Sequence, residues 1–234
     1  MLKDFKDKIS SLNKTSESDI AQLYYDISLA KPITDEIALL QSSLPSLFDI
    51  QSITENFPLS QPNSINSVVH QEINRYNYLL TTVKEDLAKT LNAMEGNNNA
   101  TKHVETIAYH LKGETVPEHW QAPQLPAKEL SEWLKSLNEH VKFFQDWAEY
   151  GQPNVFTLSV FWNVKGFLRA VKIRFAREVN CSFDDVDFSF GFTKSDETIG
   201  LERLYLENAD WDPKHNRLIE SKSNQKYVKM PTVV

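Results

Sequence analysis

The apolar residues of this chain follow helical spacing over most of its length. The clearest case runs from about residue 63 to residue 94, where an apolar residue recurs every three or four positions, as on one face of an α-helix. Gly96 and three asparagines follow it, and such residues commonly end helices. The pattern predicts a long amphipathic helix packed in a bundle, with a coiled coil as the alternative. Its apolar stripe is Ile65, Val68, Val69, Ile73, Tyr76, Leu79, Leu80, Val83, Leu87 and Leu91.

Shorter helical patterns lie on both sides of this segment. Before it, we expect helices that begin at Ser16 or Ser18, at residues 34–36 and after Asp49, then a linker over 57–62. After it, residues 100–111 and 128–150 predict two helices, joined by an ordered loop over 117–126 that contains three prolines. Residues 155–179 are the most apolar segment and predict a buried helix with a basic side.

After about residue 180, the apolar residues recur at every second position. Val186, Phe188 and Phe190 alternate with polar residues, as in a half-buried strand. Residues 204–207 and 218–220 predict two more strands, and residues 230–234 look like a strand that is cut short. We therefore expect a fragment of a longer chain. The predicted fold class is α+β and mostly α: a helical bundle, then a small antiparallel β-sheet that is truncated and has an open edge.

Composition narrows the class of protein. The formal net charge is −7 over 234 residues, so no basic surplus indicates binding to nucleic acid or to a membrane surface. No apolar run approaches the roughly 20 residues that span a bilayer, and the charged N-terminus lacks a signal core. One cysteine excludes an internal disulfide framework and a cysteine-based zinc site. We expect a cytoplasmic protein.

The glycines exclude two nucleotide-binding motifs. The sequence has six glycines, and the two closest are Gly191 and Gly200. A P-loop needs two glycines about five positions apart, and a dinucleotide fingerprint needs three within about six positions. Neither motif can be present, so we expect no ATP site of these kinds in this chain.

Few residues suggest metal or catalytic chemistry. His103 and His110 fit one helix face, but they are two turns apart and do not share a metal without a ligand between them. Asp184, Asp185 and Asp187 can be a cation site, but we favour a cap at Ser182 with Asp184 and Asp185 in its acidic first turn, and Asp187 facing outward on a strand. An enzyme built on these aspartates stays an alternative hypothesis.

Two further candidates favour structural interpretations. Cys181 has no base within its own motif, so we expect a buried structural thiol. Asp210-Trp211-Asp212 can be a carboxylate pair, a metal site or the corner of a hairpin, and the turn-forming residues 212–216 favour the hairpin. The aromatic residues between Trp133 and Phe192 predict core. We expect no catalytic, cofactor-binding or metal-binding residue.

Five segments in one order resemble the C-terminal region of a dynein heavy chain, closer to axonemal than to cytoplasmic forms. The matching motifs are Gln-Glu-x-x-Arg-Tyr-Asn-x-Leu-Leu, Gly-x-Pro-x-x-Phe-x-Leu-Ser and Leu-x-Leu-Glu-x-Ala-x-Trp-Asp. The sequence departs from the family at Val160-Phe161-Trp162-Asn163 and Leu168-Arg169-Ala170. The segments are QEINRYNYLL (71–80), VPEHW (116–120), FFQDWAEYGQPNVFTLSVFWNVKGFLRAVKIRFAREVN (143–180), VDFSF (186–190) and LYLENADWDPKHNRLIES (204–221).

The resemblance implies a division of the sequence and a role for it. Residues 1–60 resemble the helical lid end of the sixth AAA+ module, and residues 61–234 resemble an incomplete C-terminal domain of the heavy chain. In the family this region is not catalytic: it packs on the AAA+ ring and tunes ATP-driven motility, while ATP and Mg²⁺ bind in the upstream ring. A free-standing helical adaptor is the alternative.

The resemblance also implies partners and a location. The expected partners are the ring of the same heavy chain and, through the whole complex, intermediate and light chains and microtubules. Nucleic acid and membranes are not expected partners. The expected location is the cytoplasmic cytoskeleton and the axoneme of a cilium or flagellum.

Overall fold

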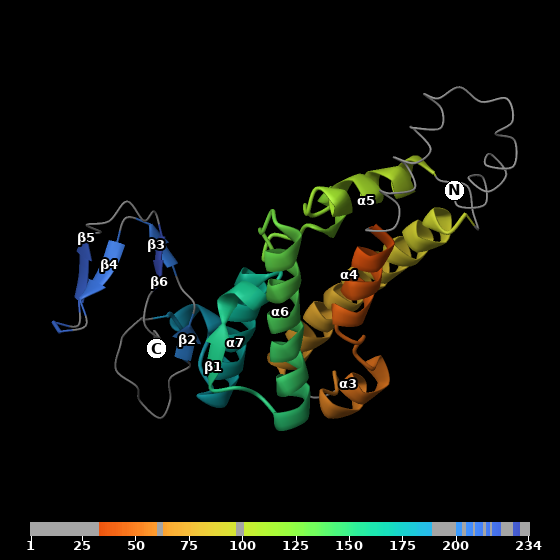
Figure 1. Cartoon of the computed structure of the whole chain (residues 1–234). Helices are drawn as coiled ribbons and strands as arrows, with labels where there is room; N and C mark the ends of the chain where they lie inside the picture. Colours follow the sequence, from red (N-terminus) through yellow and green to blue (C-terminus); the bar gives the residue numbers. More distant parts are fainter. Residues whose placement is uncertain are drawn as a thin grey trace, which may run out of the picture. The chain divides into compact units, whose positions relative to one another are not determined.

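The structure is a computed structural model of the whole chain. It describes residues 33–59, 63–96, 101–188, 200–202, 205–207, 209–212, 214–215, 217–220 and 227–229. Helices dominate this part of the protein, which confirms the predicted mostly helical class (Figure 1). The helix expected to begin at Ser16 or Ser18 and the expected strand over 230–234 lie outside the described residues.

The helices of the first 150 residues follow the predicted order. A helix over 33–43 precedes α3 (Ile50–Asn56), α4 (Ser64–Met94) and α5 (Lys102–Lys112). The short 3-10 helix η2 (Glu118–Trp120) lies in the expected crossing loop, and α6 (Leu130–Tyr150) follows. Asp49 caps α3 as predicted, because its side chain accepts a hydrogen bond from the amide of Gln51.

The single helix predicted over 155–179 is wrong in its first part. The segment begins with strand β1 (Val155–Thr157) and the 3-10 helix η3 (Leu158–Val160), and only then forms α7 (Val164–Glu178). β1 pairs in parallel with β2 (Gly200–Glu202), in the register Val155 to Gly200. This pairing joins segments far apart in the sequence, so the local apolar pattern does not reveal it.

The C-terminal strands form pairs. β3 (Tyr205–Glu207) pairs antiparallel with β6 (Tyr227–Lys229), and β4 (Ala209–Asp212) pairs antiparallel with β5 (Arg217–Glu220). The described strands thus make three two-stranded ladders, one of them parallel, and a single antiparallel sheet stays a prediction. The strand expected from Val186 is wrong for residues 186–188, which follow the 3-10 helix η4 (Phe183–Asp185) without strand structure. Residues 189 and 190 lie outside the described part.

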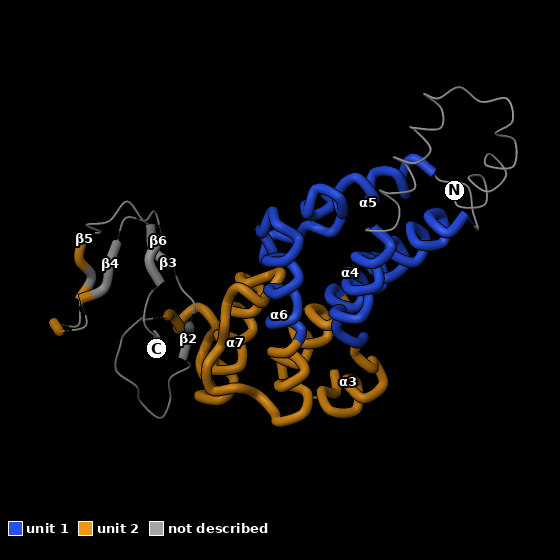
Figure 2. Tube along the Cα trace, in the orientation of Figure 1, with its two compact units in different colours: residues 1–47, 75–141 blue, residues 48–74, 142–234 orange. Residues whose placement is uncertain are grey.

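The protein divides into two compact units (Figure 2). Unit 1 comprises residues 1–47 and 75–141, and unit 2 comprises residues 48–74 and 142–234. The long helices α4 and α6 each contribute residues to both units. The predicted domain boundary near residue 60 stays a prediction.

Unit 1 has a core of aliphatic and indole side chains. Trp120 and Trp133 stack with ring centroids 5.7 Å apart, and the Tyr76 hydroxyl lies 3.2 Å from His140 Nδ1. Lys84 and Asn138 fix the segment after the first described helix, through bonds to the carbonyls of Pro45 and Ser43. The most buried apolar side chains include those of Ile37, Tyr76, Leu80, Leu87, Ile107, Leu111, Trp120, Leu125, Trp133, Leu137 and Val141.

Unit 2 has an aromatic core, as the density of aromatic residues predicts. Phe161 and Phe167 stack with ring centroids 4.2 Å apart, and Phe144 and Trp147 stack at 6.0 Å. Phe156 lies against Trp147 and Phe167. Such pairs add about 0.5–1.5 kcal/mol each beyond the area that they bury.

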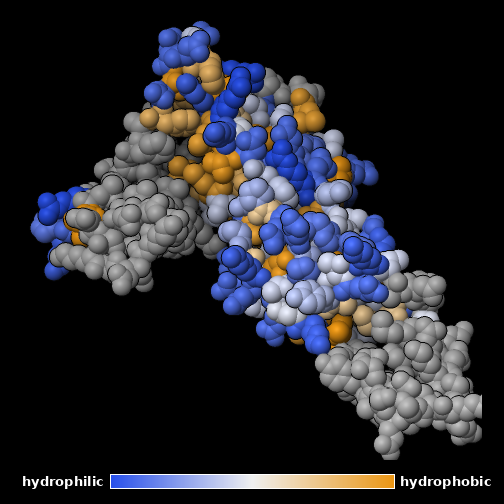
Figure 3. Space-filling model, turned by 90° about the horizontal axis from the view of Figure 1, so that it is seen from above, coloured by the Kyte–Doolittle hydropathy of each residue, from blue (hydrophilic) through white to orange (hydrophobic). Residues whose placement is uncertain are grey.

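One face of the described part is largely polar (Figure 3). On the face shown in Figure 3, hydrophilic residues cover most of the coloured surface, and hydrophobic residues form smaller patches between them. Among the described helices, none combines the length and the apolar character that a bilayer crossing requires.

Candidate functional site

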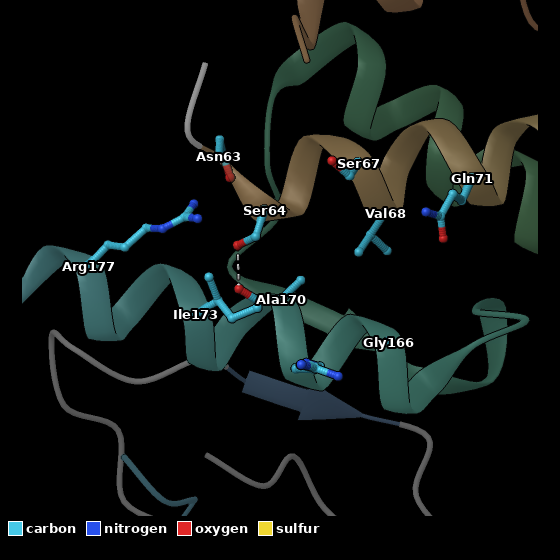
Figure 4. Close-up of a pocket in the computed structure, with 10 residues that line it drawn as sticks. Asn63, Ser64, Ser67, Val68, Gln71, Gly166, Ala170, Ile173 and Arg177 are labelled. Carbon is cyan, nitrogen blue, oxygen red and sulfur yellow. Dashed lines mark hydrogen bonds between the residues drawn. The ribbon is translucent and has the colours of Figure 1, made fainter. Parts of the chain in front are cut away.

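An open pocket lies in unit 2 between the first turns of α4 and one face of α7 (Figure 4). Its volume is about 450 Å³. The Ser64 hydroxyl donates a hydrogen bond of 2.6 Å to the Ala170 carbonyl and ties the two helices together at the pocket. The lining residues are Asn63, Ser64, Ser67, Val68 and Gln71 from α4 and its cap, and Gly166, Arg169, Ala170, Ile173 and Arg177 from α7.

The charge of this pocket comes from two arginines on α7. Arg169 and Arg177 are both exposed and both line the pocket, eight positions apart on α7. The Arg169 guanidinium also lies over the Phe183 ring, 5.7 Å from its centroid, with Lys172 Nζ at 4.5 Å from the same ring. The pocket is therefore a locally basic site on a protein of net charge −7.

A buried carboxylate fixes the start of α7 beside this pocket. Glu72, on α4, is only 1% exposed. Its Oε2 accepts the amide of Trp162 at 2.7 Å and its Oε1 accepts the amide of Asn163 at 3.2 Å. Asn163 in turn caps α7 by accepting the amide of Gly166 at 2.8 Å. Glu72 thus fixes the backbone just before α7, the helix that carries Arg169 and Arg177.

A second polar cluster lies in unit 1. The Asp86 carboxylate, on α4, is almost fully buried. Its Oδ1 lies 2.8 Å from His103 Nε2, and its Oδ2 lies 2.6 Å from His119 Nε2 and accepts the indole N–H of Trp120 at 2.9 Å. Burial by itself raises the pKa of Asp86, but the hydrogen bonds from His103, His119 and Trp120 outweigh it and hold that pKa below its usual value.

His103 and His110 both lie on α5, but they contact different partners. His103 faces Asp86, whereas His110 Nδ1 lies 2.9 Å from the hydroxyl of Thr115. Sequence reasoning missed Asp86 and His119. Asp86 lies on α4 and His119 lies in the crossing loop, 33 positions later, so no local spacing in the sequence indicates that they meet.

Ser182 caps η4 as favoured, with Asp184 and Asp185 in its acidic first turn. Ser182 Oγ accepts the amide of Asp184 and caps η4. Within the described residues, Asp184, Asp185 and Asp187 are exposed and belong to no group of converging metal ligands.

The prediction of a buried Cys181 is wrong, because the thiol is exposed. The backbone turns out of α7 at Asn180, which has a left-handed φ of 54°. The Cys181 amide then bonds back to the Ala176 carbonyl at 2.9 Å. This arrangement ends the helix and leaves the cysteine on the surface.

The hairpin interpretation of Asp210-Trp211-Asp212 is confirmed. All three residues lie in β4, and Asp212 pairs with Arg217 across the turn. Asp212 Oδ1 accepts the amides of Lys214 and His215, and Oδ2 lies 2.6 Å from His215 Nδ1. Hydrogen bonds led by the one from His215 lower the pKa of Asp212. The carboxylate therefore stabilises a turn.

Comparison with known proteins defines the class of this protein. The family model for the C-terminal domain of the dynein heavy chain matches residues 3–234. The protein belongs to this family.

Three relatives that it matches are axonemal heavy chains. It is 32% identical over 215 residues to human dynein axonemal heavy chain 1, and the match spans 88% of this chain and 5% of that protein. It is 28% identical to the mouse dynein axonemal heavy chains 12 and 3, over 86% of this chain and 7% and 5% of those proteins. The chain therefore spans only a small part of the length of these relatives.

Proposed function

We propose that this chain is a non-catalytic, structural and regulatory C-terminal segment of an axonemal dynein heavy chain. It packs on the AAA+ ring of the same heavy chain and tunes ATP-driven movement along microtubules. The observation that carries the proposal is the family match over residues 3–234. The names of the relatives support the axonemal assignment, and with it a location in the cilium or flagellum.

The buried Glu72 carboxylate supports a structural role. Both of its oxygens accept backbone amides, those of Trp162 and Asn163. A carboxylate whose oxygens are all engaged in fixed contacts holds segments together and is poorly placed to take a proton from a substrate. As the resemblance to dynein heavy chains implies, we expect ATP and Mg²⁺ to bind in the upstream ring of the parent protein.

The basic pocket of unit 2 is the surface that we assign to ring contact. Arg169 and Arg177 line the pocket together with the apolar side chains of Val68 and Ile173. Figure 4 shows the Arg177, Val68 and Ile173 side chains around it. An acidic segment of the upstream heavy chain with apolar side chains is the partner that complements this surface.

The proposal is tested by binding in trans. The 234-residue protein is mixed with a recombinant axonemal dynein ring that lacks its own C-terminal domain, and binding and ATP turnover are measured. We expect saturable binding, a changed ATPase rate of the ring and no ATP turnover by the isolated 234-residue protein. Turnover by that protein above a matched blank contradicts the non-catalytic assignment. Stable binding to another ciliary protein instead of the ring points to the adaptor alternative.

A charge reversal tests the contact surface separately. The double variant Arg169→Glu with Arg177→Glu should weaken ring binding by about tenfold or more and reduce its salt dependence. Lys165→Glu is the matched control, because Lys165 is exposed on the same helix but does not line the pocket. If the double variant binds as the control does, ring contact occurs elsewhere, and the family assignment is unaffected.

A further inference from the structure

The Asp86 cluster has the composition and convergence of a metal site. One carboxylate oxygen or imidazole nitrogen from each of Asp86, His103 and His119 lies within 4.8 Å of the others. We propose that these three residues bind a divalent transition-metal ion, with Zn²⁺ as the best fit. This proposal is independent of the role of the protein on the dynein ring.

The donor set selects the class of metal. Two imidazole nitrogens and one carboxylate oxygen form a set that zinc enzymes and non-haem iron proteins use, and it leaves further positions for water. Hard cations such as Ca²⁺ and Mg²⁺ prefer oxygen ligands alone. The cluster contains no thiolate, so ions that need sulfur ligands are not favoured.

The distances allow a metal ion with small side-chain movements. In a tetrahedral Zn²⁺ site with bonds of about 2.1 Å, neighbouring ligand atoms lie about 3.4 Å apart. Nε2 of His103 lies 2.8 Å from Oδ1 of Asp86, Nε2 of His119 lies 2.6 Å from Oδ2, and one ligand atom from each residue lies within 4.8 Å of the others. Binding through Oδ1 requires the His103 separation to lengthen by less than about 1 Å and the His119 imidazole to turn from Oδ2 toward the ion, movements that are open to partly exposed imidazoles.

The surroundings of the cluster provide both support and access. Trp120 is fully buried, and its indole N–H holds Oδ2 of Asp86. If the metal binds through Oδ1, this bond orients the ligand in the way that outer-shell partners of metal sites do. The side chains of His103 and His119 are 51% and 39% exposed, so an ion and its water ligands can enter from solvent.

The site connects three elements that are separate in the sequence. Asp86 is on α4, His103 is in the first turn of α5 and His119 is in η2. A bound ion therefore cross-links the crossing loop and α5 to the long helix. Because the three ligands converge only in the folded unit, binding stabilises the folded state.

The test is a ZnCl₂ titration of the chelator-treated 234-residue protein by calorimetry, repeated with Co²⁺ to record the absorption of the bound ion. We expect one bound equivalent and a tetrahedral or five-coordinate Co²⁺ spectrum. His103→Ala and His119→Ala should each weaken binding by more than about a hundredfold, beyond the 10- to 100-fold typical of outer-shell partners. His110→Ala is the matched control and should bind as the unmutated protein does, since His110 contacts Thr115 instead.

A second measurement does not depend on the variants. At a hundredfold excess of Zn²⁺ over the dissociation constant, the thermal midpoint should rise by about 5 °C or more. This rise in the thermal midpoint should vanish in His103→Ala, a variant that leaves the core intact because the His103 side chain is exposed. Absence of stoichiometric Zn²⁺ binding by the unmutated protein overturns the proposal. Binding that His103→Ala and His119→Ala leave unchanged overturns it as well.

Discussion

Replacing Glu72 should destabilise unit 2 far more than replacing an exposed carboxylate of the same helix. Glu72 is 1% exposed and accepts the amides of Trp162 and Asn163 at 2.7 and 3.2 Å. A hydrogen bond to a charged group contributes about 1.5–3 kcal/mol, and a buried amide left without an acceptor costs about 1–3 kcal/mol. Glu72→Gln keeps one acceptor oxygen and turns an NH₂ group toward the other amide, so we expect a loss of about 2–3 kcal/mol.

Urea unfolding, followed by circular dichroism, measures this difference against a matched control. Glu85→Gln removes a carboxylate of α4 that is 60% exposed and pairs with Lys89, for which about 0.3–0.5 kcal/mol is typical. Hydrogen exchange should also show faster exchange at the start of α7 in Glu72→Gln only. Equal stabilities of the two variants, or an unchanged exchange rate at Asn163 and the first turn of α7, would refute the reasoning.

Three further predictions concern turns and caps. Cys181 is exposed. A colorimetric thiol reagent should therefore modify this cysteine in the folded protein at a rate close to that in the urea-unfolded protein. Strong protection of the thiol in the folded protein would contradict the fold at this turn. Gly151 has a φ of 89°, and an added Cβ would have no neighbouring atom within 4 Å. Gly151→Ala should therefore lower the free energy of unfolding by about 1 kcal/mol from backbone strain alone. An unchanged urea midpoint would argue against this conformation. The hydrogen bond from Ser52, with that from Gln51, lowers the pKa of Asp49. The protection of α3 from hydrogen exchange should therefore be present above about pH 4 and fall as the pH drops through the lowered pKa. Asp49→Asn should remove this pH dependence, and an identical pH profile in that variant would disprove the assignment.

The sequence predicts the helices well because their apolar stripes and caps involve residues that are only a few positions apart. The apolar stripe from Ile65 to Leu91 sets both the length of α4 and its buried face. The cap at Asp49 and the turn at Asp212 are also readable, because the side chain and the amides that it accepts are within three positions of each other.

The features that sequence reasoning missed depend on contacts between distant segments. The apolar run from Val155 suggests a helix, but pairing with Gly200–Glu202 makes its first residues a strand. The convergence of Asp86, His103 and His119 depends on how α5 and the following loop fold against α4. Cys181 lies just beyond the end of an apolar segment, and only the left-handed turn at Asn180 places it on the surface.

The central claim is that this chain is part of an axonemal dynein heavy chain, and an immunoblot tests it most directly. An antibody raised against the 234-residue protein is applied to whole-cell lysate and to isolated cilia or flagella. The account predicts one band far larger than the 27.0 kDa of the 234 residues, enriched in the ciliary fraction. A band near 27.0 kDa without ciliary enrichment would contradict it and favour a free-standing adaptor that shares the fold of the family.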